Sequence, residues 1–243
     1  MGTRRASPDP FERADAALAS ALRHDERVGL AKGLVRGADG VVRCWWAGAD
    51  PLYLRYHDRE WGRPVKAESR LFEKVCLEGF QAGLSWITIL RKREAFRSAF
   101  ARFDPEAVAR FGARDVARLR RDAGIVRHRG KIESTINNAR RALALRAEGG
   151  LAAYVWRFEP EARLRPRRLT RERVISMTTS AASAAISRDL KTRGWTFIGP
   201  TTAYAFMQAM GLVNDHVEGC AARAICELDR TAFRRPSRSA TWA

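Results

Sequence analysis

The chain has 243 residues, of which 46% are hydrophobic and 30% are charged, so it is long enough to bury one sizeable core. No run approaches the roughly 18 consecutive apolar residues of a membrane span, and the first residues lack the apolar centre of a secretion signal. We therefore expect a soluble, cytoplasmic protein and exclude an integral membrane protein.

The net charge is +18, and most of it belongs to the body of the chain. Residues 1–40 contribute +1 and residues 221–243 contribute +3, which leaves +14 for residues 41–220. A domain this basic suits a polyanion, most often nucleic acid. The alternative is a general preference for arginine, which greatly outnumbers lysine here.

The N-terminal part is predicted to be an extension over residues 1–40, partly disordered, with residues 37–40 (GADG) as a linker. We expect the compact domain to start near Val41. Helical signals dominate from residue 69 onward, where Ser69 can cap a helix that carries Leu71, Phe72, Val75 and Phe80.

Further helices follow in chain order. A helical run covers about 85–103, and Asp104-Pro105 places an N-cap and a first-turn proline before a helix that stops at Gly112. The next helix is expected to end at Gly124, a residue suited to a helix C-terminus.

The second half continues the helical pattern. Residues 132, 136, 139 and 143 are apolar at helical spacing, and further helices are expected from Ser180 to near Gly194 and from Pro200 to Gly211. Strand signals are scarce, with Trp195 to Ile198 as a short candidate. The predicted fold class is all-α.

The chain has four cysteines and four histidines, and two Cys/His pairs stand out. Cys44-x12-His57 lies near the start of the domain and His216-x3-Cys220 near its end. Two thiolates and two imidazoles fit one tetrahedral zinc ion, which would clip the two ends of the domain together. The alternative is two unrelated pairs. Cys76 and Cys226 would remain as ordinary thiols.

A carboxylate falls on an apolar helix face. Leu71, Val75, Glu78 and Ala82 share one stripe, whereas Glu73 does not. A carboxylate in such a position needs a partner, either an arginine in a structural ion pair or the donor edge of a flat ligand.

Aromatic residues crowd the stretch 44–62. A set of rings beside a buried acid can line a pocket for a flat molecule, whereas a plain aromatic core is the alternative. The candidate rings are Trp46, Tyr53, Tyr56, Trp61 and Trp86.

A basic turn is predicted between two helices. Residues 110–131 hold eight basic and two acidic residues, centred on AGIVRHRGK with a glycine near each end, Gly124 and Gly130. Such a turn can aim backbone N–H groups at a phosphate, or be a solvated connection.

Four segments closely resemble bacterial 3-methyladenine DNA glycosylase I. They are DPLYLRYHDREWG, LEGFQAGLSWITIL, AGIVRHRGKI and YAFMQAMGLVNDHVEGC, and the likeness runs from about Cys44 to Cys220. It implies an all-α, helix-hairpin-helix glycosylase domain, which we place over 41–222. It does not cover residues 1–40 or 221–243, and we expect 223–243 to form a basic tail. It also implies one structural zinc ion and, as partner, double-stranded DNA with an alkylated base.

The resemblance also implies residue roles. Glu78 and Tyr56 would hydrogen-bond the extruded base, Trp86 would stack on it, and Trp46, Tyr53 and Trp61 would complete the pocket. Gly83 and Leu84 would enter the DNA, and the turn with Gly124, Arg127, Arg129, Gly130 and Lys131 would grip it. The zinc ligands would be Cys44, His57, His216 and Cys220.

Two positions depart from the family pattern. Trp45 stands where a small residue is expected, and Pro200 where threonine is expected. Trp45 can narrow the pocket or the zinc corner. Asp215 is expected to orient backbone or a zinc ligand.

The activity implied is hydrolysis of the N-glycosidic bond of 3-methyladenine by a monomeric enzyme without strand-cleaving lyase activity. One alternative is a zinc-stabilised DNA-binding module without catalysis. Another is a binder of small aromatic cations.

Overall fold

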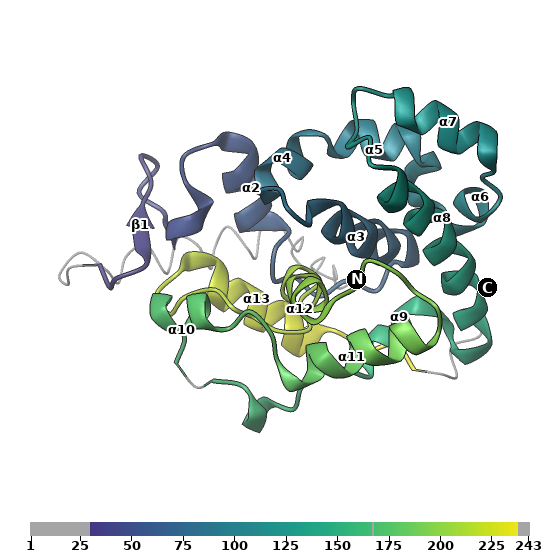
Figure 1. Cartoon of the computed structure of the whole chain (residues 1–243). Coiled ribbons are helices and arrows are strands. Elements are labelled where there is room, and N and C mark those ends of the chain that lie inside the picture. Colours follow the sequence, from purple (N-terminus) through teal and green to yellow (C-terminus); the bar gives the residue numbers. More distant parts are fainter. Residues whose placement is uncertain (1–29, 167, 238–243) are drawn as a thin grey trace, which may run out of the picture.

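The computed structural model describes residues 30–166 and 168–237, and helices gather around the central helix α3, Glu68–Gln81 (Figure 1). The expectation of a mostly helical chain is confirmed; one small antiparallel hairpin of β1 (Leu34–Arg36) and β2 (Val42–Cys44) is added. The other α-helices are α2 (Pro51–Arg59), α4 (Trp86–Arg91), α5 (Arg93–Ala99), α6 (Pro105–Ala109), α7 (Ala113–Arg121), α8 (Arg129–Ala144), α9 (Gly150–Trp156), α10 (Arg171–Ser176), α11 (Ala181–Thr192), α12 (Pro200–Ala209) and α13 (Ala221–Ala232).

Helix α3 is buried on every side from Leu71 to Phe80. The predicted stripe is therefore only part of a fully covered helix, and Glu73, expected off the stripe, is buried as well. A helix in the middle of a helical domain has neighbours all round, which amphipathic periodicity does not reveal. The consequence is that α3 holds three charged side chains, Glu73, Lys74 and Glu78, inside the protein.

Several predicted helix starts are confirmed. Asp104 caps α6 with Pro105 in its first turn, Ser180 caps α11, and Pro200 opens α12. Aspartate and serine favour the N-cap because their side chains accept a hydrogen bond from a free backbone N–H of the first turn. Proline favours the first helical position because it has no backbone N–H that needs a partner. Asp50 and Pro51 give the same signal for α2, which was not expected.

Other expectations were wrong. Ser69 lies inside α3, which begins one residue earlier, and the run 85–103 is broken between α4 and α5 at Lys92. Residues 195–198 are irregular instead of a strand, with a bend at Phe197, whose φ is 54°. A positive φ is strained for a residue with a side chain, so tertiary contacts must hold it.

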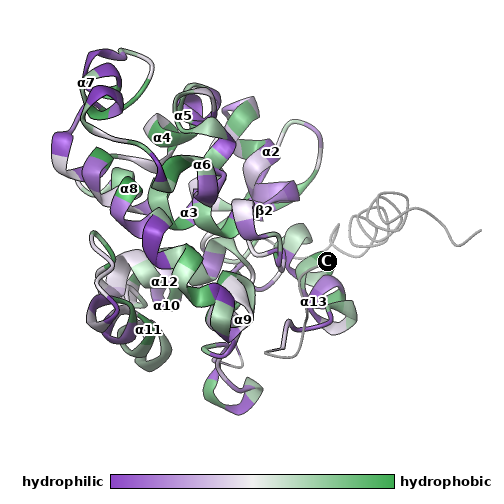
Figure 2. Cartoon of the chain, turned by 90° about the vertical axis from the view of Figure 1, so that its right-hand side faces the viewer, coloured by the Kyte–Doolittle hydropathy of each residue, from purple (hydrophilic) through white to green (hydrophobic). Residues whose placement is uncertain are grey.

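Helices α7 and α8 form a helical hairpin at one end of the molecule. Helix α7 ends at Arg121, earlier than the predicted Gly124, because Asp122 is extended and its side chain accepts a bond from the Gly124 N–H at 2.8 Å. Figure 2 shows the hydrophilic colour of α7 at the outer edge. The connection between the two helices is thus held by its own hydrogen bonds.

The ends of the described chain differ from expectation. The predicted linker 37–40 is the turn of the β1–β2 hairpin, closed by a hydrogen bond from the Gly37 N–H to the Val41 carbonyl at 2.9 Å. The expected tail begins with α13, whose Ile225, Cys226 and Arg230 are buried. Their spacing is helical, so one face packs on the domain. The disorder expected for residues 1–29 lies outside the described residues.

Because α3 is buried, shortening one of its apolar side chains should cost much stability. Leu71 is fully buried, so Leu71→Ala should lower the free energy of unfolding by about 2–5 kcal/mol. Leu228, 61% exposed, is the matched control, and Leu228→Ala should change it little. Urea denaturation of both variants measures this; equal losses would contradict the central position of α3.

Within residues 30–166 and 168–237, the helices are too short or too polar to cross a bilayer.

Candidate active site

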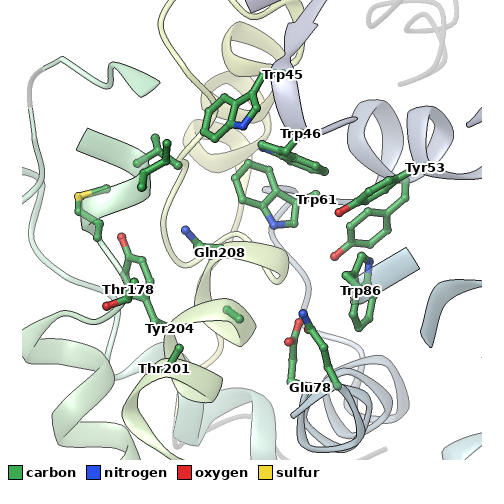
Figure 3. A pocket seen from close by; sticks show the side chains of 16 residues that line it. Trp45, Trp46, Tyr53, Trp61, Glu78, Trp86, Thr178, Thr201, Tyr204 and Gln208 are labelled. Atoms are coloured by element: carbon green, nitrogen blue, oxygen red, sulfur yellow. The ribbon is translucent and has the colours of Figure 1, made fainter. Parts of the chain in front are cut away.

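An open cavity of about 330 Å³ lies between α2, α3 and α4 on one side and α10 and α12 on the other. All six predicted pocket residues line it, which places the rings and the acid in one site (Figure 3). Its lining consists of Trp45, Trp46, Tyr53, Tyr56, Trp61, Glu78, Gln81, Trp86, Val174, Ile175, Met177, Thr178, Thr201, Tyr204, Ala205 and Gln208.

The rings form a continuous wall. Trp46 packs against Tyr53 and Trp61 with ring centroids 5.4 and 4.9 Å apart, and Tyr56 packs against Trp86 at 5.4 Å. The indole N–H of Trp86 is buried and has no hydrogen-bond partner among the described residues. The wall can therefore offer a stacking surface to a ligand.

Glu78 lies at one end of this wall and is 5% exposed. Its carboxylate pairs with the Lys74 ammonium at 2.7 Å, and the same ammonium donates to the Tyr56 hydroxyl at 2.8 Å. Sequence reasoning missed Lys74, because its i, i+4 spacing to Glu78 permits an ion pair but does not reveal that the pair is buried. The partner that the buried acid required is thus a lysine and not an arginine.

Burial changes the acid–base properties of this group. It raises the pKa of Tyr56 well above 10, and the nearby Glu78 carboxylate raises it further. Burial lowers the pKa of Lys74, although Glu78 partly opposes that shift. Both effects favour the neutral hydroxyl form of Tyr56.

The opposite wall of the cavity comes from α12. Tyr204 and Gln208 lie one turn apart on it and line the cavity, and both donate to the Asp215 carboxylate, at 2.6 and 2.8 Å. Asp215 therefore braces this wall through two side chains, whereas it was expected to orient backbone or a zinc ligand. The i, i+4 spacing of the two residues on α12 was the signal that sequence reasoning missed.

Trp45 lies between the cavity and the small apolar cluster that contains Cys44 and Cys220. It lines the cavity, and the Arg171 guanidinium lies 5.4 Å from the centre of its ring. Arg171 opens α10, which supplies Val174 and Ile175 to the cavity wall. The expectation that Trp45 narrows the pocket agrees with this position.

The loop after α3 and the helical hairpin lie side by side. The Lys131 ammonium is buried and donates to the carbonyls of Phe80 and Ala82, at 2.9 and 2.6 Å. Its charge thus faces the protein, where it caps the end of α3, and burial lowers its pKa. Beyond Ala82, Gly83 has a φ of 82° and Leu84 is 41% exposed.

The turn between α7 and α8 packs tightly against the domain at its two glycines and exposes basic side chains to solvent. A side chain at Gly124 would approach the Ala95 Cβ to 2.9 Å, which leaves no room for any other residue. Arg127 and Arg129 are exposed, and Gly130 is tightly packed against His128. The predicted basic residues therefore divide into two exposed arginines and one inward lysine.

Cys44, His57, His216 and Cys220 converge in a buried cluster, as the pairing of the two ends of the domain predicted. Their ligand atoms all lie within 4.8 Å of one another, a spacing that can hold a metal ion. Burial alone would raise the pKa of the Cys220 thiol, but hydrogen bonds with Cys44, His216 and His57 outweigh it and lower that pKa.

Both imidazoles are oriented by acceptors outside the cluster. The Nδ1–H of His57 donates to Asp58 at 2.8 Å, and the Nε2–H of His216 donates to the Trp61 carbonyl at 3.1 Å. The other nitrogen of each ring then faces the Cys220 sulfur, 3.5 Å away in both cases. Arg43 holds Asp58 in turn. Imidazoles that are oriented by outer acceptors and face sulfur atoms are typical of metal sites.

The family model for methyladenine glycosylase matches residues 46–224. The chain belongs to the methyladenine glycosylase family. It is 50% identical over 186 residues to DNA-3-methyladenine glycosylase 1 of Escherichia coli, which covers 74% of this chain and 96% of that protein. It is 43% identical over 190 residues to DNA-3-methyladenine glycosylase of Haemophilus influenzae, covering 74% of this chain and 97% of that one.

A solved structure of a family member agrees in fold. The 3-methyladenine DNA glycosylase I of Staphylococcus aureus, solved to show 3-methyladenine recognition, is 36% identical to this chain and superposes with a TM-score of 0.69. The match covers 74% of this chain and 96% of that one. The chain therefore has the fold of this glycosylase family.

Proposed function

We propose that this protein is a DNA-3-methyladenine glycosylase, which hydrolyses the N-glycosidic bond of 3-methyladenine in alkylated DNA. The observation that carries the proposal is the buried Glu78 carboxylate set among Tyr56 and Trp86 at the wall of an open aromatic cavity. The curated relatives from E. coli and H. influenzae, named for this activity, support it.

The cavity would receive the base turned out of its duplex. Glu78 would accept hydrogen bonds from the donor edge of the purine, Tyr56 would stand beside it, and Trp86 would stack on its flat face. Extrusion costs least at a damaged base, which adds to selection. Trp46, Tyr53 and Trp61 would exclude water from the remaining faces.

Cleavage needs little acid catalysis. A 3-methylated adenine in DNA is cationic, so the bond from its N9 to the sugar C1′ is already weak. As water adds to C1′, the C1′–N9 bond breaks, the purine takes the bonding electrons and leaves as the neutral base, and solvent receives the proton. The enzyme supplies positioning and a dry, shaped cavity.

We propose that the enzyme has no strand-cleaving lyase activity. Such activity needs an uncharged lysine amine at the sugar C1′. The lysine nearest the cavity, Lys74, is 5% exposed, and its ammonium is bound by Glu78 and Tyr56. The cavity lining itself contains no lysine among the described residues.

The DNA surface of this proposal is a helix-hairpin-helix element together with the loop after α3. The turn from Gly124 to Gly130 would hold a phosphate of double-stranded DNA, and Arg127 and Arg129 would add charge. Gly83 and Leu84 would enter the duplex beside the extruded base, because the Lys131 contacts keep this loop next to the hairpin. We expect a cytoplasmic monomer acting on chromosomal DNA.

The Cys/His cluster is proposed to hold one structural zinc ion. The donor set fits: two sulfurs and two imidazole nitrogens oriented by Asp58 and Trp61 from outside. When bound, the ion would neutralise the thiolates and tie residues 44–57 to residues 216–220. It would take no part in base release.

The hairpin predicts a salt-dependent effect on affinity. Arg127→Gln with Arg129→Gln should weaken binding to undamaged duplex DNA about tenfold or more and lower the slope of log affinity against log salt by roughly one to two. Arg188→Gln, an exposed arginine on α11, is the control. Fluorescence anisotropy at several salt concentrations measures this; an unchanged slope would contradict the role of the hairpin.

The function is tested by incubating the protein with methylated duplex DNA and identifying the freed bases. Release of 3-methyladenine, with the DNA strands intact until alkali is added, is the expected result. Binding without release would favour the non-catalytic module. Binding of small aromatic cations without salt-dependent DNA affinity would favour a protein that binds such cations and has no role on DNA.

A further inference from the structure

Lys74 contacts three of the groups proposed to recognise the base. Its ammonium lies 2.7 Å from a Glu78 carboxylate oxygen, 2.8 Å from the Tyr56 hydroxyl and 3.2 Å from the centre of the Trp86 ring. The Lys74 side chain is 7% exposed. One buried cation therefore occupies the carboxylate, the hydroxyl and a face of the indole before any ligand enters.

The lysine reaches these groups from behind the cavity wall. It is absent from the cavity lining and lies in a small space shared by Tyr56, Trp86 and a ring of charged residues. These charged residues already have partners of opposite charge. Glu60 pairs with Arg70 and Arg93, and Glu73 pairs with Arg97. Lys74 is thus the cation left to balance Glu78.

This arrangement changes what the cavity attracts. An unpaired carboxylate among rings favours any cation, and the negative face of an indole does the same. Here the carboxylate is already neutralised, and the ring already carries an ammonium whose charge repels a second cation nearby. A flat ligand then gains little from a positive charge of its own.

We propose that Lys74 is a specificity-determining residue that weakens the preference of the cavity for cationic bases. Selection then rests on flat shape and on the donor pattern that Glu78 reads, and a neutral flat ligand binds nearly as well as a cationic one. The proposal rests on the proposed function, since it concerns the same cavity. It extends the accepted ligands toward neutral modified purines.

The test compares two flat probes of equal size. 2-Methylisoquinolinium carries a permanent charge, whereas 3-methylisoquinoline is neutral at pH 8. Calorimetric titration of the full chain should give dissociation constants within about threefold of each other, and Lys74→Met should favour the cation by about tenfold or more. A wild-type preference for the cation above about tenfold overturns the proposal without any variant.

Three variants separate charge from structure. Lys74→Arg keeps the charge and should keep the wild-type ratio, and so should Lys66→Met, which removes an exposed lysine outside the cavity. Lys74→Gln removes the charge but keeps hydrogen-bond donors, so it replaces the Met variant if that one does not fold. A ratio that stays at the wild-type value in folded Lys74→Met or Lys74→Gln overturns the proposal.

Base release is measured on the same samples. If the ratios of the probe dissociation constants are as expected but no 3-methyladenine is released, the proposed function is wrong and the role of Lys74 stands. Normal release with a strong cation preference in the wild type would do the reverse.

Discussion

Replacing Glu78 by glutamine should cut the release of 3-methyladenine at least about tenfold in kcat/KM. The substitution keeps the size of the side chain but turns half of its acceptor end into a donor, which would face the donor edge of the base. A hydrogen bond to a charged group contributes about 1.5–3 kcal/mol, which corresponds to roughly 10- to 150-fold in rate. Single-turnover release from methylated DNA measures it.

Glu73→Gln is the matched control for this variant. Glu73 lies on the same helix and is equally enclosed at 8% exposed, but it pairs with Arg97 and does not line the cavity. Both substitutions should cost stability, because each breaks a buried ion pair. Only Glu78→Gln should slow release; equal rates for the two variants would remove Glu78 from the base site.

Replacing Cys220 by alanine should abolish the proposed zinc binding and destabilise the fold. Loss of one of four ligands should lower the zinc content from about one ion per chain to a small fraction of that. Structural metal sites contribute several kcal/mol, and each kcal/mol moves Tm by about 2–4 °C for a chain of this size, so we expect a fall of roughly 10 °C.

Cys226→Ala provides the control for the zinc measurement. Cys226 is a buried thiol a few residues further along, outside the cluster, and burial raises its pKa to about 12. This variant should keep its zinc in elemental analysis. An equal zinc-to-protein ratio in Cys220→Ala and the wild type would exclude the cluster as the metal site.

Local signals predicted the parts of the fold that local chemistry determines. Asp104 with Pro105 and Ser180 marked helix starts because capping depends on a few adjacent residues. The break at Lys92 and the strained bend at Phe197 left no such mark. They follow from packing between segments far apart in the chain, which overrides local preference.

The candidate site divides in the same way. Glu78 was identifiable because a lone acid on an apolar stripe is anomalous, and the Cys/His pairs because of their residue types. Lys74 could not be identified from the sequence, because a lysine and a glutamate one turn apart on a helix ordinarily form a solvated pair. Its burial depends on α2 and α4 covering α3, which periodicity along one helix does not show.

The nine residues of α2 connect two features of the molecule. Tyr53 and Tyr56 face the cavity, whereas the adjacent His57 joins the cluster that includes residues 216 and 220. A helix this short has no stability of its own and opens as one unit. Loosening at residues 216–220 would therefore reach the wall of the cavity directly, through His57 and the two tyrosines on the same helix.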